Sequence, residues 1–178
     1  SLYCRHQTRS CRPHAQPALP RRSANYHGTR HTAPDQGVVV TRSVAQKMGV
    51  KVGARAFFVN APTPALEAIE LPELEVSENL TGDFDYIHLF TITRAEMNQT
   101  FRLLKACLRP SGMLWVSWPK GRPPGSDLSL PTVIEIGYSH GLVESTCLRI
   151  DDTWAGLKFT HPKTGKVYNN SYGTLPKT

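Results

Sequence analysis

The sequence predicts one α/β domain whose sheet is mostly parallel and ends in an antiparallel hairpin. Short apolar runs suited to strands alternate with helical patterns, and two such runs close the series without a helix between them. A length of 178 residues suffices for one core but not for two ordinary domains. Strands that alternate with helices are joined by right-handed crossovers and pair in parallel, so we expect a Rossmann-like sheet.

The first half of the domain is predicted to consist of short elements. Residues 43–48 have the pattern of a helix, and the apolar run 55–59 is typical of a strand that is buried on both faces. Thr63 is expected to cap a short helix over 64–70. Residues 74–76 are expected to form a brief edge strand.

The second half carries the stronger patterns. Thr93 precedes a run in which apolar residues recur at helical spacing, and the turn residues 110–112 are expected to end that helix. Ser126 or Asp127 is expected to cap the last helix. The predicted helices cover 94–108 and 127–140, and the predicted strands cover 85–91, 113–118, 142–150 and 154–160.

Charge separates a basic leader from a nearly neutral domain. The formal net charge is +7, but residues 1–34 hold six arginines and no acidic residue, which leaves +1 for the rest. We expect 1–40 to be a disordered basic leader or a non-native extension, 41–162 to be the Rossmann-like domain and 163–178 to be a polar tail. If the protein binds nucleic acid at all, we expect it to do so only through the leader.

Apolar content and cysteine usage suggest a soluble, cytoplasmic protein. No apolar run approaches the roughly 20 residues of a membrane-spanning helix, and the start lacks the apolar core of a secretion signal. Cys4, His6, Cys11 and His14 offer zinc-ligand chemistry, but their spacing matches no familiar zinc site. No metal is predicted.

Four segments, spread over nearly the whole expected domain, carry a family resemblance: 44–49, 84–90, 114–120 and 152–159. Together they resemble a bacterial family known as domain of unknown function 3052, and Trp-Val-Ser-Trp-Pro-Lys over 115–120 is the most specific of them. The resemblance implies a shortened class I methyltransferase-type architecture and no assigned reaction. It supports the fold more than the function.

The expected cofactor half departs from that of a methyltransferase. The turn after the first strand, 60–64, contains two prolines and none of the glycines that let a cofactor approach the backbone. Glu75 or Glu78 would have to replace the acid that holds the ribose. Only 25 residues separate Val59 from Asp85, too few for two strand-and-helix units. We predict no cofactor, and S-adenosylmethionine is disfavoured.

Ligands of open α/β sheets bind beyond the carboxyl ends of the strands. Arg94 and Lys120 could hold an anion there with the helix start near Thr93, and Trp118 could supply an apolar wall. The alternative is a solvated arginine, a solvated lysine and a core tryptophan. The candidate ligand-binding residues are Asn60, Thr91, Thr93, Arg94, Ser117, Trp118 and Lys120.

His88, Asp152 and Trp154 are weaker candidates. His88 lies in mid-strand, where a histidine is more often a bonded packing residue than a base. Turn chemistry explains Asp152, and Trp154 is expected in the core or at a partner surface. Ser117 lacks a Gly-x-Ser-x-Gly elbow and is expected to bond the backbone. No catalytic residue is predicted.

The sequence leaves three functions open. A non-catalytic domain that binds a small anion, a protein partner or a second copy of itself is favoured, because no complete catalytic set is present. A divergent S-adenosylmethionine-dependent methyltransferase, or another small-molecule enzyme, would use the crevice around Thr91, Arg94, Ser117 and Lys120. The third function is nucleic-acid or anion binding through the leader.

Overall fold

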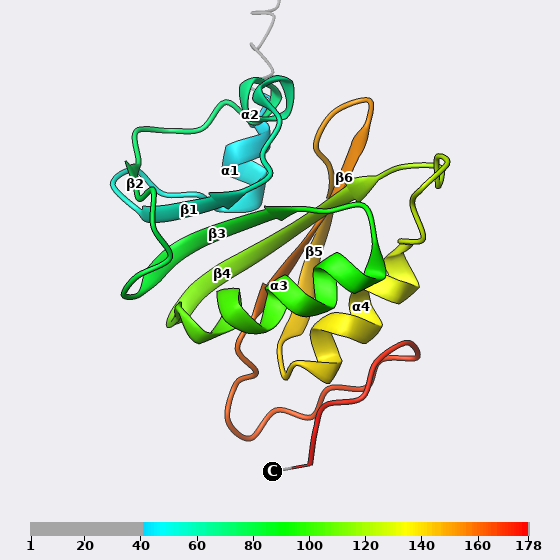
Figure 1. The fold of residues 1–178 in the computed structure, drawn as a ribbon. Coiled ribbons are helices and arrows are strands. Elements are labelled where there is room, and N and C mark those ends of the chain that lie inside the picture. Colours follow the sequence, from blue (N-terminus) through cyan, green and yellow to red (C-terminus); the bar gives the residue numbers. More distant parts are fainter. Residues whose placement is uncertain (1–40, 178) are drawn as a thin grey trace, which may run out of the picture. The chain divides into compact units, whose positions relative to one another are not determined.

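The computed structural model describes residues 41–177 as one folded unit (Figure 1). The leader predicted over 1–40 and its cysteine and histidine set lie outside the described residues. The chain forms a six-stranded sheet in the order β2-β1-β3-β4-β6-β5. Neighbours from β2 to β4 are parallel, and β6 runs antiparallel to both β4 and β5. The predicted α/β fold, a mostly parallel Rossmann-like sheet that ends in an antiparallel C-terminal hairpin, is confirmed.

The elements of the first half are as short as their sequence patterns. Helix α1 has a capping box, in which Ser43 and Gln46 bond each other's backbone amides. Helix α2 starts one residue earlier than predicted, so that Pro62 rather than Thr63 is its N-cap. The elements are α1 (Val44–Met48), β1 (Arg55–Val59), α2 (Thr63–Ile69) and β2 (Glu75–Val76).

The second half supplies the centre of the sheet and its two longest helices. Its elements are β3 (Phe84–Phe90), α3 (Arg94–Ala106), β4 (Leu108–Pro119), α4 (Leu130–Ser139), β5 (Val143–Arg149) and β6 (Trp154–Thr160). As predicted, Thr93 caps α3, because its hydroxyl accepts a hydrogen bond from the amide of Glu96 at 3.2 Å. No helix in residues 41–177 is long and apolar enough to cross a membrane.

Strand β4 begins earlier than predicted. Leu108 pairs with Phe84, and the register then shifts before Tyr86 pairs with Met113. The residues expected to form a turn are therefore an irregular stretch of the strand. The Arg109 side chain donates to both carboxylate oxygens of Asp85, at 2.6 and 2.7 Å, and ties this stretch to β3.

The predicted cap of the last helix was wrong. Helix α4 begins at Leu130, and Ser129 is its N-cap. Asp127 instead accepts a 2.7 Å hydrogen bond from the backbone amide of Arg94, at the start of α3. The loop after β4 is therefore longer than predicted, and its carboxylate accepts a hydrogen bond from a different helix.

Two apolar layers lie on opposite faces of the sheet. Helices α3 and α4 cover one face with residues such as Phe101 and Ile134, and α1 and α2 cover the other with residues such as Met48 and Ile69 (Figure 1). The tail also packs on the α3–α4 side through Tyr168 and Leu175. The larger layer therefore continues beyond residue 162.

Candidate functional site

Strands β1, β3 and β4 run in parallel and end at one edge of the sheet, which we call the carboxyl edge (Figure 1). After β1 the chain forms β2 on one side of β1, and it then crosses back to form β3 on the other side. The strand order therefore reverses between β1 and β3. Such a reversal is where open α/β sheets bind ligands. Asn60 follows β1, Thr91 follows β3, and Trp118 and Lys120 lie at the end of β4.

A carboxylate that sequence reasoning missed lies at this reversal. Asn60 donates a hydrogen bond to one Glu96 carboxylate oxygen at 2.8 Å, and the Thr91 hydroxyl donates to the other at 2.7 Å. The amide of Ile92 is 3.4 Å from the second oxygen. Glu96 is half-buried, and it brings together two predicted site residues from neighbouring strands. The Thr93-x-x-Glu96 capping pattern is the signal that could have found it.

The turn after β1 bends sharply without glycine. Asn60 has a φ of +53°, in the left-handed region that asparagine tolerates better than most residues. Its amide group bonds Glu96, and it also lies 3.5 Å from the carbonyl oxygen of Phe90. Asn60 therefore makes the turn for which cofactor-binding Rossmann sheets use a glycine, and its side chain is directed toward α3.

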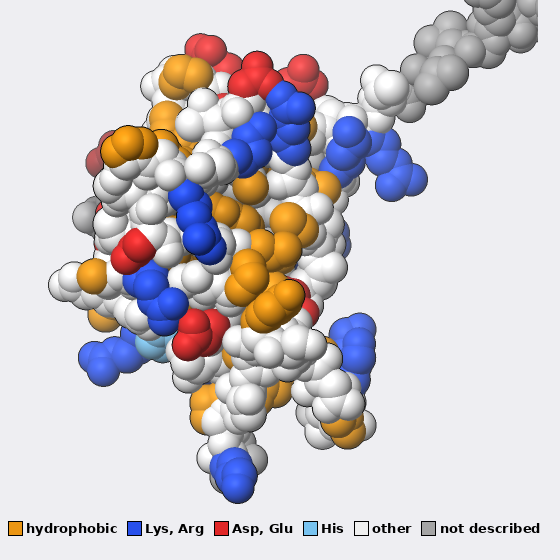
Figure 2. Space-filling view, turned by 90° about the vertical axis from the view of Figure 1, so that its right-hand side faces the viewer, with side chains coloured by type: hydrophobic (Ala, Val, Ile, Leu, Met, Phe, Trp, Pro, Cys, Tyr) orange, Lys and Arg blue, Asp and Glu red, His pale blue; other side chains and the backbone are white. Residues whose placement is uncertain are grey.

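A hollow of about 470 Å³ adjoins the end of β4. The Lys120 ammonium donates to the backbone carbonyl of Asp151 at 2.8 Å, which holds it beside the hollow. Figure 2 views the carboxyl edge, where hydrophobic side chains gather at the centre with lysine and arginine side chains beside them. The lining residues are Trp118, Pro119, Lys120, Gly121, Arg122, Leu128, Ser129 and Leu130.

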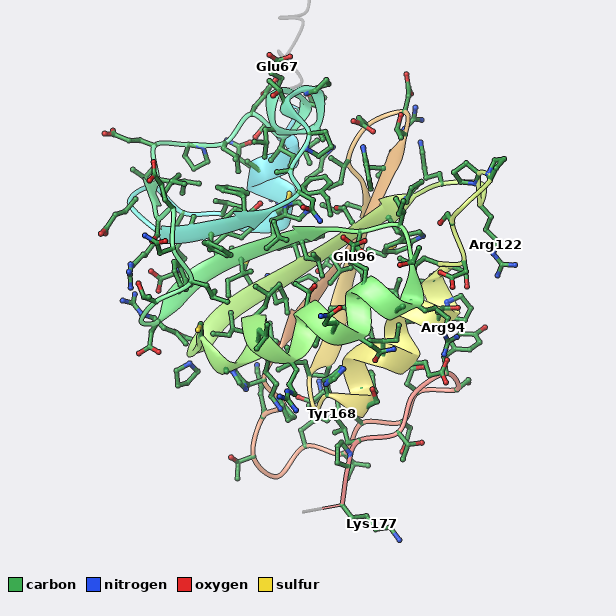
Figure 3. All side chains as sticks on the ribbon, viewed as in Figure 1. Glu67, Arg94, Glu96, Arg122, Tyr168 and Lys177 are labelled. Carbon is green, nitrogen blue, oxygen red and sulfur yellow. The ribbon has the colours of Figure 1, made fainter. Side chains whose placement is uncertain are left out.

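Arg94 does not join Lys120, contrary to the predicted anion site. Its guanidinium pairs with Glu135 on α4 at 3.1 Å, and Figure 3 shows it beside α4. The start of α3 is also occupied, because Asp127 accepts from the Arg94 amide and the Thr93 hydroxyl accepts from the Glu96 amide. One carboxylate and one hydroxyl of this chain thus occupy the helix start at which the sequence predicted a bound anion.

His88 and Ser117 lie inside the sheet rather than at its edge. Both are fully buried, and the His88 Nε2 and Ser117 hydroxyl are 2.8 Å apart. The other ring nitrogen lies 2.8 Å from the Tyr86 hydroxyl. Burial lowers the pKa of His88 to about 3, so the ring is neutral. The expectation that Ser117 bonds the backbone was wrong, because its hydroxyl forms a hydrogen bond with the His88 ring instead.

The other weak candidates have local partners. Asp152 is exposed and pairs with Arg149 in the turn between β5 and β6. Trp154 is half-buried and packs edge-on against Phe90, with ring centroids 5.2 Å apart. It also pairs with Pro119, which places it near the end of β4. Among residues 41–177, no three His, Cys, Asp or Glu side chains are grouped to hold a metal ion.

The chain matches no family model and no curated protein. The resemblance described above therefore stays a prediction. Similar solved structures include precorrin-6y C5,15-methyltransferase from Geobacter metallireducens GS-15, with 10% identity, a TM-score of 0.46, and 73% of this chain and 94% of that chain covered. A ribosomal protein L11 methylase from Lactobacillus delbrueckii subsp. bulgaricus has 12% identity and a TM-score of 0.44, with 67% and 76% covered.

Magnesium protoporphyrin IX methyltransferase from Synechocystis PCC 6803 is similar both with bound S-adenosylmethionine and with bound S-adenosylhomocysteine. The identities are 10% and 11%, the TM-scores are 0.42, and 67% of this chain is covered together with 74% and 78% of those chains. These bound ligands correct the prediction of no cofactor. That prediction relied on the missing glycines, on the two prolines of the turn and on the short segment before Asp85, and it did not consider that Asn60 can make the turn.

Proposed function

We propose that this domain binds a small molecule at the carboxyl edge of its sheet. The observation that carries the proposal is the hollow at the end of β4, which has Trp118 as an apolar wall and Lys120 and Arg122 as cations. Apolar walls with a few convergent polar groups are the usual make-up of small-molecule sites. The two cations favour a ligand that carries an anionic group.

The chemistry at the strand reversal narrows the class of ligand. Each Glu96 oxygen has two lone pairs, and the oxygen bonded to Asn60 keeps one of them free for a further donor. A carboxylate at such a reversal is suited to accept hydrogen bonds from ribose hydroxyls. S-adenosylmethionine has both groups that these residues would bind: a ribose for Glu96 and a carboxylate for Lys120.

S-adenosylmethionine-dependent methyl transfer is therefore the specific function that we favour. Glu96 would hold the ribose, Lys120 would hold the carboxylate of the methionine part, and the bound cofactor would supply the methyl group. A domain that binds the same ligand without turnover would use the same residues. Production of S-adenosylhomocysteine by the protein would distinguish an enzyme from a binding domain.

Calorimetric titration of S-adenosylhomocysteine into the full chain tests the proposal. We expect binding that Glu96→Gln and Lys120→Met each weaken at least about tenfold, since each removes a charged partner. Glu67→Gln and Lys177→Met are matched controls, because Figure 3 shows both residues well away from the carboxyl edge. We expect the controls to bind within about twofold of the wild type.

Two outcomes would overturn the proposal. One is the absence of heat together with an unchanged melting temperature at millimolar ligand. The other is binding that Glu96→Gln and Lys120→Met leave as tight as in the controls. Thermal unfolding of each variant verifies that a loss of binding is not a loss of fold.

A further inference from the structure

A second hollow lies at the other end of the strands. It has a volume of about 510 Å³ and adjoins the start of β1, the start of β3 and the end of β6, which we call the amino edge. No residue expected at the carboxyl edge lines it. The lining residues are Gly49, Lys51, Val52, Gly53, Ala54, Asp85, Ser111, Gly112, Met113, Lys158 and Thr160.

Positive charge predominates in the amino-edge hollow. Its one carboxylate, Asp85, is held by Arg109 through two hydrogen bonds. Burial opposes ionisation of Asp85, but the bonds from Arg109 and from the amide of Arg55 outweigh it and lower the pKa of that carboxyl. Asp85 is therefore charged and already paired. Lys51 and Lys158 also line the hollow, and neither lysine forms an ion pair within residues 41–177.

Lys158 is the more confined of the two lysines. It is half-buried, and its ammonium donates a long hydrogen bond of 3.5 Å to the carbonyl oxygen of Met48. No ion pair within residues 41–177 includes it. Partial burial lowers the pKa of Lys158, as expected for an ammonium that lacks an anionic partner. A bound anion would supply that partner.

The remaining lining can receive an uncharged part of a ligand. Met113, Val52 and Ala54 are apolar, and Ser111 and Thr160 add hydroxyl groups. Gly49 lies beside Lys158, where an added Cβ would be 3.5 Å from the ammonium nitrogen.

We propose that the amino-edge hollow is a second ligand site, which binds a small organic anion through Lys158 and Lys51. The site is separate from the carboxyl edge and does not depend on the function proposed there. Its anionic group bonds the two ammonium groups, and its apolar part lies against Met113 and Ala54.

Amide NMR of the full chain during titration with phenyl phosphate tests this site. We expect saturable shifts at Lys51, Gly53, Gly112 and Thr160, at constant ionic strength. Lys158→Met should weaken the apparent affinity at least about tenfold, because it keeps the length of the side chain and removes its charge. Lys158→Arg should keep the affinity within about threefold. Lys163→Met, in the exposed tail, is the matched control.

The same titration can also contradict the proposed site. The proposal fails if shifts follow exposed lysines throughout the chain, if they fall only at the ends of β1, β3 and β4, or if Lys158→Met binds like Lys163→Met. Equal affinity for inorganic phosphate and phenyl phosphate would overturn the apolar part of the site. Shifts at the amino edge of the wild type do not depend on whether any variant folds.

Discussion

At the scale of single residues, three side chains form a hydrogen-bonded row inside the sheet. Tyr86, His88 and Ser117 are fully buried, and each ring nitrogen of His88 lies 2.8 Å from a hydroxyl. Buried polar groups are costly unless they are bonded. In this row each of the three polar side chains has a hydrogen-bond partner, so the first role of the row is to stabilise the pairing of β3 with β4.

Acid should destabilise the domain through His88. The folded pKa is about 3, below the usual 6.5, so between these values the unfolded chain binds a proton that the folded chain does not. Stability is therefore lost as pH falls below 6.5. From pH 7 to pH 5 the free energy of unfolding should fall by about 2 kcal/mol because of this group alone.

Urea unfolding at the two pH values measures this dependence. His88→Gln carries no titrating ring, so its loss of stability between pH 7 and pH 5 should be smaller than that of the wild type by about 2 kcal/mol. An equal loss in both proteins would show that His88 does not stay neutral in the fold.

The sequence predicted which candidate site residues lie at the carboxyl edge, but it did not predict their hydrogen-bond partners. Asn60, Thr91, Trp118 and Lys120 lie at the carboxyl edge because position along a strand fixes which edge a residue reaches. Glu96 escaped notice because an acid in the first turn of a helix is ordinarily explained by the helix dipole. Its contact with Asn60 joins residues 36 positions apart, which no local pattern encodes.

At the scale of elements, the contact between α4 and β6 depends on one glycine. An added Cβ on Gly137 would overlap the ring of Phe159, which is fully buried and also packs edge-on against Phe101 at 5.4 Å. The ring has no room to move away. Glycine in mid-helix normally costs about 1 kcal/mol relative to alanine, so its presence here reflects close packing.

Gly137→Ala should therefore destabilise the domain despite its better helix propensity. We expect a net loss of about 1–3 kcal/mol, the usual cost of overpacking. Ser139→Ala, on the exposed side of the same helix, should change stability by less than about 0.5 kcal/mol. Urea unfolding of the two variants compares them directly. If Gly137→Ala is as stable as Ser139→Ala, the close packing of α4 on β6 is not real.

Hydrophobic periodicity predicted the existence of the helices and strands more reliably than it predicted the residues at which they begin. The apolar spacing in α3 and the apolar runs of β1 and β3 identified them, because those residues are selected by burial. The start of β4 was missed because residues 110–112 have turn chemistry and yet lie within the strand, where its register with β3 shifts. Tertiary contacts, here the bond between Arg109 and Asp85, overrode the local preference.

At the scale of the whole molecule, the sheet presents two different edges. The carboxyl edge has the strand reversal, Glu96 and the hollow beside Trp118 and Lys120. The amino edge has the larger hollow with Lys158. We propose the carboxyl edge for the cofactor, although the hollow at the amino edge is larger, because open α/β sheets usually bind ligands where the strand order reverses.

Hydrogen–deuterium exchange of the full chain with and without S-adenosylhomocysteine tests the central claim most directly, because it reports which edge the ligand covers. We predict slower exchange in peptides from the ends of β1, β3 and β4, covering 59–66, 90–97 and 118–131, and unchanged exchange around 49–54. Slower exchange confined to 49–54 and 109–113, or no change at millimolar ligand, would contradict it.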